Sequence, residues 1–130
     1  MDVMTKALIL ISMMVCLTSV ANAISGEAIL YRPPYAPSRC FGPKDQGVMV
    51  ARAHGSLFAY GKACGWKYRV RCTSGKNKAI PNACTGNTVD VTIVDRCETC
   101  GADVLELSQE AFAQIARPEL GKVNVEYAQI

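Results

Sequence analysis

The sequence has few of the residues and patterns that several kinds of binding site require. It contains one histidine, His54, so a zinc site built from histidine and cysteine is not expected. It has no dense basic run and no base-stacking motif, which argues against nucleic acid as a partner. Beyond the N-terminal segment it has no long apolar run of the kind that spans a bilayer. We therefore predict no metal, no cofactor, no nucleic-acid partner and no transmembrane anchor.

The first 23 residues are typical of a signal peptide. An apolar stretch runs from Ala7 to Val20, and the small-x-small pattern Ala21-Asn22-Ala23 follows it. The stretch is shorter than the roughly 20 apolar residues of a bilayer span. We expect cleavage after Ala23 and a secreted domain of residues 24–130, with a retained membrane anchor as the alternative.

Cysteine is well represented, with seven residues in the chain. Cys16 lies in the leader, so the mature protein should keep six, and an even number in an exported domain predicts three disulfides. Six cysteines allow fifteen pairings, and the residues alone do not choose among them. The six are Cys40, Cys64, Cys72, Cys84, Cys97 and Cys100.

Short strands dominate the predicted secondary structure. Polar and apolar residues alternate over residues 88–93 and 122–127, as they do in half-buried strands. Residues 26–31, 48–52 and 68–72 are further β-rich segments separated by turn residues. The mature chain is thus predicted to be one mainly β domain.

One helix is expected after Ser108. That residue can cap the helix, Glu110 lies at its positive end, and Pro118 should end it. A second short helix is possible over residues 56–60. Several short strands, one or two helices and three disulfides are typical of a small closed barrel.

Six segments in order resemble the expansin-like EG45 domain. They are Gly26 to Tyr31 with the following Pro33-Pro34-Tyr35 and Cys40, Gly61 to Gly65, Arg69 to Cys72, Ala83 to Gly86, Val89 to Asp95, and Leu105 to Ala116. Within that family the likeness extends to the plant natriuretic peptide-like proteins and to EG45-like proteins related to a citrus blight-associated protein. The resemblance implies a six-stranded double-psi β-barrel and secretion to the apoplast. Nothing in the sequence requires more than a monomer, which is the state we expect.

The same resemblance implies a disulfide pattern. Matching the expansin pairs gives Cys40–Cys64 and Cys72–Cys84, which leaves Cys97–Cys100. A C-x-x-C pair can also be a redox centre, but Glu98 lies between these cysteines, and an acid does not lower a thiol pKa. We expect this pair to shape a loop.

The resemblance also implies a glycan groove. Asp95 matches an aspartate of the expansin groove, and Glu106 takes the place of the second acid, preceded by Val104 and Leu105 where the family has histidine and phenylalanine. Tyr35 and Trp66 are candidate stacking platforms for sugar rings, and Tyr31 could belong either to the groove or to the core. Alternatively, Asp95 caps backbone amides at a strand end and Glu106 is a solvated acid.

A second candidate surface comes from the basic first half of a chain with formal net charge +3. In the natriuretic peptide-like group, activity is attributed to a segment that matches roughly residues 50–71. A basic and aromatic surface of this kind could face a plasma-membrane receptor. Its candidate residues are Arg52, His54, Lys62, Trp66, Lys67, Arg69 and Arg71.

Three functions remain open at this stage. The first is a secreted, non-enzymatic signal in water and solute homeostasis and in stress or defence responses. The second is a cell-wall polysaccharide-binding protein without hydrolytic activity. The third is a lytic glycan-cleaving enzyme, which the altered acid pair disfavours because acid catalysis needs a correctly placed carboxyl group. We expect no enzyme and assign no catalytic residue.

Overall fold

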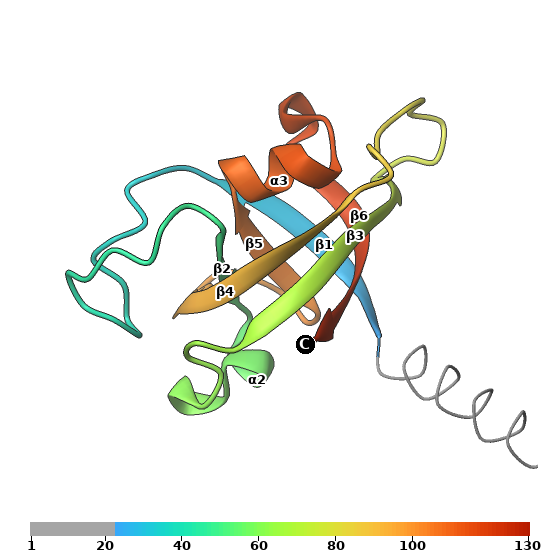
Figure 1. Cartoon of the computed structure of the whole chain (residues 1–130). Coiled ribbons are helices and arrows are strands. Elements are labelled where there is room, and N and C mark those ends of the chain that lie inside the picture. The colour runs from blue at the N-terminus through green and yellow to red at the C-terminus, as the bar shows by residue number, and fades with distance from the viewer. Residues whose placement is uncertain (1–22) are drawn as a thin grey trace, which may run out of the picture.

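The computed structural model describes residues 23–130, so all of the predicted signal peptide except Ala23 lies outside the described residues. Six strands and four short helical segments follow one another in this part of the chain (Figure 1). Within residues 23–130 no helix is both long and apolar enough to cross a membrane. The strands are β1 (Ile24–Tyr31), β2 (Val50–Ala53), β3 (Lys67–Gly75), β4 (Thr88–Arg96), β5 (Val104–Ser108) and β6 (Lys122–Gln129).

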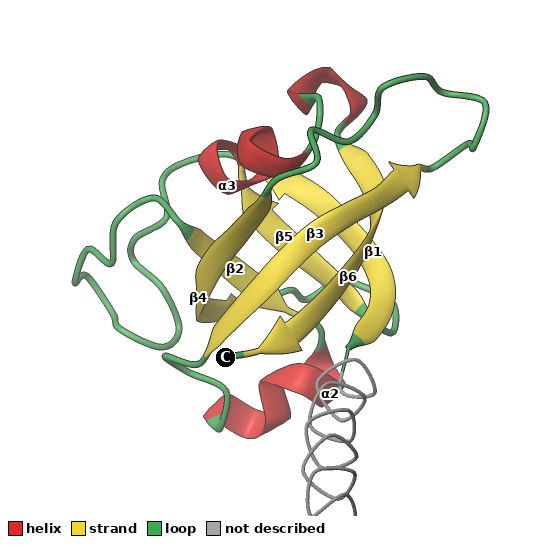
Figure 2. Ribbon diagram, turned by 45° about the vertical axis from the view of Figure 1, so that its right-hand side comes forward, coloured by secondary structure: helices red, strands yellow, loops and turns green. Residues whose placement is uncertain are grey.

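The six strands close into a barrel in the order β1-β5-β2-β4-β3-β6. β1 pairs with β5 in parallel and β2 with β4 in parallel, whereas the other four pairings are antiparallel. Figure 2 shows the strands wrapping around a common interior. Closure removes the exposed sheet edges that would otherwise pair with other chains. The predicted mainly β, six-stranded double-psi barrel is confirmed.

Alternation along the strands fills the barrel interior. On β3, Tyr68, Val70 and Cys72 are buried while Lys67, Arg69 and Arg71 between them are exposed, which is the two-residue period of a half-buried strand. β5 differs, because four of its five residues are buried. The largest fully buried side chains are Tyr127, Phe112, Ile93, Leu105, Leu107 and Ile115.

Two helical segments lie at opposite ends of the barrel (Figure 1). At one end α3 (Gln109–Ile115) starts at Ser108, whose hydroxyl oxygen accepts a hydrogen bond from the Ala111 backbone N–H at 3.1 Å. At the other end α2 (Gly55–Phe58) continues into the 3₁₀ turn η1 (Ala59–Gly61). Another 3₁₀ turn, η2 (Pro118–Leu120), follows α3. Both helices that the sequence predicted are therefore present, near their expected positions.

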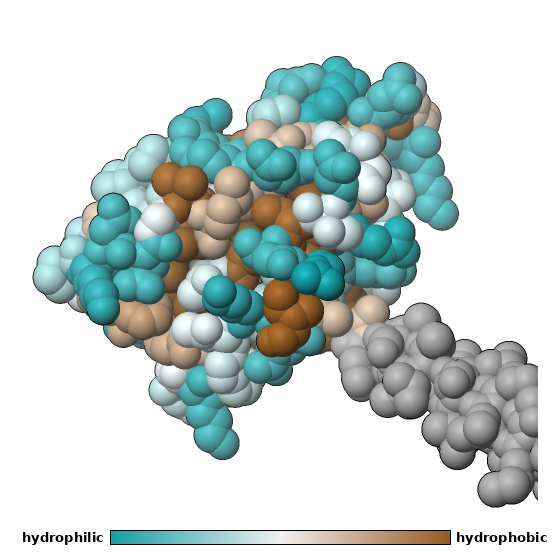
Figure 3. Space-filling view, in the orientation of Figure 1, coloured by the Kyte–Doolittle hydropathy of each residue, from teal (hydrophilic) through white to brown (hydrophobic). Residues whose placement is uncertain are grey.

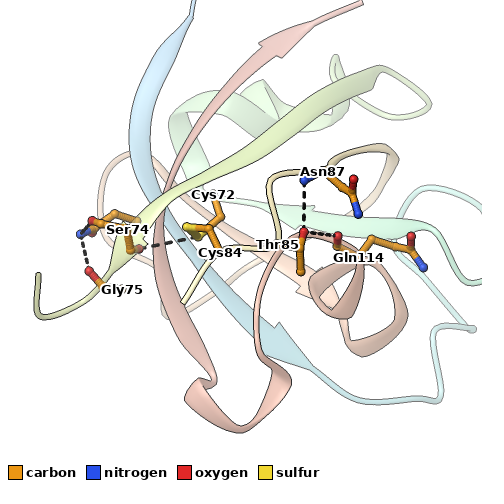
Figure 4. Close-up of a disulfide and its surroundings, with 8 residues drawn as sticks. Cys72, Ser74, Gly75, Cys84, Thr85, Asn87 and Gln114 are labelled. Atoms are coloured by element: carbon orange, nitrogen blue, oxygen red, sulfur yellow. Dashed lines mark hydrogen bonds between the residues drawn. A yellow bond between two sulfur atoms is a disulfide. The ribbon is translucent and has the colours of Figure 1, made fainter. Parts of the chain in front are cut away.

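Three disulfides join segments of the described chain, and one of them ties a strand to a loop. They join Cys40 to Cys64, Cys72 to Cys84, and Cys97 to Cys100, the pairs that the resemblance implied. Figure 4 shows how the Cys72–Cys84 bond ties the end of β3 to the loop that precedes β4. In that loop the Thr85 hydroxyl donates to the Gln114 carbonyl at 2.7 Å, which links the loop to α3.

Hydrophobic residues on the face drawn in Figure 3 are interspersed with hydrophilic ones. The large hydrophobic side chains that are exposed in the described chain are Val48, Tyr60, Trp66 and Ile130. Tyr60 and Trp66 both belong to the segment between β2 and β3. This segment therefore presents two of the exposed aromatic side chains of the protein.

Candidate functional site

The central feature of the candidate site is a row of charged residues on three adjacent strands. Arg52 on β2 lies opposite Asp95 on parallel β4 and opposite Glu106 on antiparallel β5. A register shift between Ala51 and Arg52 produces the Arg52–Asp95 pairing. Asp95, Arg52 and Glu106, here called the Arg52 row, thus come together from distant parts of the sequence.

Arg52 forms an ion pair with Glu106. Its Nη2 donates to Glu106 Oε2 at 3.2 Å, while Nε lies 3.1 Å from Oε1 in a geometry that does not make a hydrogen bond. The Glu106 side chain is only 16% exposed, so this carboxylate is largely removed from water. The guanidinium also lies 4.0 Å from the centroid of the Tyr31 ring, a cation–π distance. Arg52 therefore holds an acid and an aromatic ring together.

Asp95 has different partners from Glu106. Its Oδ1 accepts a hydrogen bond from the Arg96 backbone N–H at 2.7 Å and lies 3.9 Å from Arg39 Nε. The first contact is the backbone-capping role considered for Asp95 from the sequence. The side chain is 24% exposed, so it also remains accessible to a ligand.

Tyrosines pack beside the Arg52 row. Tyr31 and Tyr35 meet edge to face with ring centroids 5.2 Å apart. The Tyr31 hydroxyl is buried without a hydrogen-bond partner in the structure, and burial, more than any nearby charge, raises the pKa of Tyr31. An unpartnered buried hydroxyl is uncommon in proteins, and the core residue Tyr127 has one as well. Tyr31 and Tyr35 therefore form the aromatic part of the site, and Tyr31 is the one in contact with Arg52.

Tyr35 is fixed by α3 through its hydroxyl. It donates to Glu110 and accepts from the Gln109 backbone N–H at 3.2 Å. Partial burial and then the Glu110 bond raise the pKa of Tyr35 to about 12, and the same bond lowers the pKa of Glu110. The expected groove residues Tyr35, Asp95 and Glu106 thus lie at or beside the Arg52 row. Trp66 lies one strand further round the barrel, in the turn before β3.

The residues expected to form a signalling surface do not all share one exposed surface. Arg52 belongs to the row just described, and His54 is buried at 6% exposure. Burial lowers the pKa of His54, and the Asp103 charge opposes this effect. The remaining five candidates are exposed in the turn after η1 and on the outer face of β3, where Arg69 and Arg71 form ion pairs at 2.8 Å with Asp90 and Glu126.

Among the described residues, one group has the composition of a metal site. The sulfurs of Cys97 and Cys100 and a Glu106 carboxylate oxygen lie within 4.8 Å of one another. The two sulfurs are bonded to each other, and a disulfide sulfur is not the thiolate that a metal needs. This group therefore places the disulfide against the Arg52 row and does not suggest a metal ligand set.

Sequence reasoning did not place Arg52 in this site, and it left Tyr31 open between the core and the groove. Arg52 was assigned to the signalling surface because it belongs to a basic segment. A local signal did exist, since Arg52 is the single charged residue in the otherwise apolar strand Val50–Ala53. No local signal could show that its neighbours across the sheet are acids.

Comparison with known proteins agrees with this fold. The model of a family described as "Lytic transglycolase" matches residues 50–127. An EG45-like domain containing protein from Citrus jambhiri is 44% identical over 99% of this chain and 99% of its own length. Putative EG45-like domain containing protein 1 from Arabidopsis thaliana is 42% identical, over 95% of this chain and 98% of that protein.

Among solved structures, a mutant expansin from Clavibacter michiganensis in complex with cellohexaose superposes with a TM-score of 0.67. Its identity is 23%, and the alignment covers 83% of this chain and 50% of the expansin. This likeness concerns the fold. Taken with the relatives that match over nearly the whole chain, it shows that the protein belongs to the family of EG45-like domain containing proteins, built on the expansin-type double-psi β-barrel.

Proposed function

We propose that this protein is an expansin-like cell-wall protein that is secreted to the apoplast and binds polysaccharide at the Arg52 row without cleaving it. The observation that carries the proposal is the Arg52 row itself, where charged groups able to bond sugar hydroxyls lie beside Tyr31 and Tyr35. Carbohydrate sites combine such polar groups with aromatic rings. The cellohexaose in the related expansin structure supports a glucan as the first ligand to test.

The ion pair argues against glycoside cleavage. A general acid must carry a proton and deliver it to the leaving oxygen. Glu106 accepts a hydrogen bond from a guanidinium, and Asp95 accepts one from a backbone N–H. Both carboxylates therefore already act as acceptors, and neither is arranged as a proton donor.

Cellohexaose binding by the mature protein tests this proposal. We expect Arg52→Met and Asp95→Asn each to weaken binding, because one removes the guanidinium and the other a charged acceptor. Arg71→Met, which breaks an exposed ion pair on β3, is the matched control and should bind like the wild type. Reducing sugar released by the wild type and lost in Asp95→Asn would instead show an enzyme.

A second candidate function is extracellular signalling of the natriuretic peptide-like kind, in water and solute homeostasis and stress responses. The observation that favours it is the exposure of Tyr60, Lys62, Trp66 and Lys67 between β2 and β3, a group that could face a plasma-membrane receptor. The test is swelling of plant protoplasts by the mature protein. A Lys62→Gln, Lys67→Gln double variant should lose this response, whereas Lys76→Gln, Lys78→Gln, with the same charge loss in another loop, should keep it.

A further inference from the structure

A pocket of about 860 Å³ adjoins the Arg52 row, and residues of α2 and η1 line part of it. Arg39 from the loop between β1 and β2, Arg96 from the end of β4, and Tyr60 from η1 are among its lining residues. Arg39 also lies 3.9 Å from Asp95, so the pocket and the row are contiguous. A volume of this size accommodates a small-molecule ligand or a short oligosaccharide.

The two arginines of this pocket share one carboxylate. Glu98 accepts a hydrogen bond from Arg39 Nη2, and its other oxygen lies 3.9 Å from Arg96 Nε. The Glu98 side chain is 57% exposed, in the turn closed by the Cys97–Cys100 disulfide. An exposed acid of this kind can leave its partners at little cost, because surface ion pairs are weak. Arg39 and Arg96 therefore form a carboxylate-binding site, which Glu98 of the same chain occupies in this structure.

Gly55 contributes to the placement of Arg96. A Cβ at position 55 would lie 3.2 Å from Arg96 Nη2, so the absence of a side chain lets the guanidinium rest against the backbone. Arginine is suited to binding a carboxylate because its planar guanidinium group can donate two parallel hydrogen bonds to the two carboxylate oxygens.

Tyr60 supplies an aromatic surface at the same pocket. Its side chain is fully exposed, and its backbone is left-handed with φ of 57°, as is that of Ala59 with φ of 50°. Left-handed backbone is unfavourable for a non-glycine residue, and such strain is concentrated at functional sites. Two consecutive residues of this kind present a tyrosine ring to solvent at the pocket that Arg39 and Arg96 also line. The Tyr60 ring can stack on a sugar, and Arg39 and Arg96 can bind its carboxylate. The pocket therefore fits an acidic sugar better than a phosphate, which has no ring to stack.

We propose that this pocket binds a uronic acid unit of an acidic polysaccharide. The sugar ring stacks on Tyr60, and its carboxylate replaces Glu98 between Arg39 and Arg96. Glu98 is then an internal competitor that limits the affinity of the free protein. The inference extends the proposed polysaccharide-binding function to a second, charge-selective site next to the first.

Binding of a galacturonate oligomer to the mature protein tests the proposal, with the methyl-esterified oligomer of the same length as the neutral comparison. We expect the acid form to bind and the ester to bind at least about tenfold more weakly, because only the acid can pair with both guanidinium groups. Arg96→Gln and Tyr60→Ala should each weaken binding of the acid. Arg71→Gln removes the same charge from the distant β3 face and should leave it unchanged.

The variant that separates this proposal from general charge attraction is Glu98→Gln. It should strengthen binding several-fold, whereas Glu126→Gln, which removes an acid from the Arg71 pair, should not. Equal binding of acid and ester, an unchanged or lower affinity in Glu98→Gln, or equal losses in Arg96→Gln and Arg71→Gln would each overturn it. Retention by phosphatidylserine vesicles without binding of the oligomer would assign the arginine pair to a membrane surface and would also overturn it.

The proposal and the function on which it builds can fail separately. Cellohexaose has no carboxylate, so Arg96→Gln should not change its binding, whereas Arg52→Met should weaken it. If the wild-type protein binds cellohexaose but not the galacturonate oligomer, the acidic-sugar site is wrong. If it binds the galacturonate oligomer but not cellohexaose, the neutral-glycan function of the Arg52 row is wrong.

Discussion

Single residues decide how closely segments of this barrel approach each other, and Gly26 is the clearest example. A Cβ at position 26 would lie 1.9 Å from the carbonyl oxygen of Asp103, far inside contact distance and against backbone. We expect Gly26→Ala to lower the free energy of unfolding by more than about 2 kcal/mol, because β1 must move away from its neighbour. Urea unfolding measures this loss.

Gly101 is the matched control for that change. Nothing lies within 4 Å of a Cβ built there, and its φ is not positive. Gly101→Ala should therefore shift stability by no more than about 0.5–1 kcal/mol, in the stabilising direction. Similar losses for the two variants would contradict the steric explanation.

His54 should make stability depend on pH. Burial lowers its pKa, so the folded protein keeps the imidazole neutral while the unfolded chain takes up a proton below about pH 6.5. The contribution of His54 to the free energy of unfolding is therefore present above that pH. It is lost as the pH falls towards the folded-state pKa, by at most about 1.4 kcal/mol per pH unit. Urea titrations at pH 7 and pH 5 should show this loss in the wild type and a smaller one in His54→Gln. An equal loss in the variant would assign the effect to other groups.

At the scale of elements, α3 depends on its first turn. Ser108 is fully buried; its hydroxyl accepts from the Ala111 N–H and donates to the Val48 carbonyl, joining the helix to the loop before β2. We expect Ser108→Ala to cost about 1–2 kcal/mol, since it removes both the helix cap and the hydrogen bond to the Val48 carbonyl. Ser25→Ala, at an exposed position of β1, should be nearly neutral in the same denaturant experiment.

How well each element could be predicted follows from its burial. β4 and β6 were predicted from alternation, because each has one face in the core and one in solvent. β5 was not, since Val104, Leu105, Leu107 and Ser108 are all buried and leave no two-residue period. A strand covered on both faces cannot be recognised from alternation alone.

The candidate site could be predicted only in part, because its geometry depends on how the strands pair. Asp95 and Glu106 were proposed from the family resemblance, and the structure places both beside Arg52. The position of Arg52 between them depends on strand register and on the shift after Ala51. Register is set by long-range pairing, and a one-residue slip would turn Arg52 to the opposite face. No local pattern in the sequence contains that information.

At the scale of the whole molecule, the three disulfides should contribute unequally. They close loops with sequence separations of 24, 12 and 3 residues. Loop-closure entropy then gives about 3.4, about 2.8 and about 1.6 kcal/mol in the same order. We expect paired serine variants to lose stability in that order, with Cys97→Ser, Cys100→Ser the mildest. A larger loss there than for Cys40→Ser, Cys64→Ser would mean that the small loop is held by more than entropy.

The order of strands around the barrel has a consequence for the timing of folding. β1 is the first strand to be synthesised, yet both of its neighbours, β5 and β6, are the last. The first strand therefore has no hydrogen-bonded partner until nearly the entire chain has emerged from the ribosome. Contacts between such distant segments make folding slow compared with a helical domain of the same size. Until β5 and β6 are made, β1 therefore stays unpaired, although β2, β3 and β4 can already pair with one another.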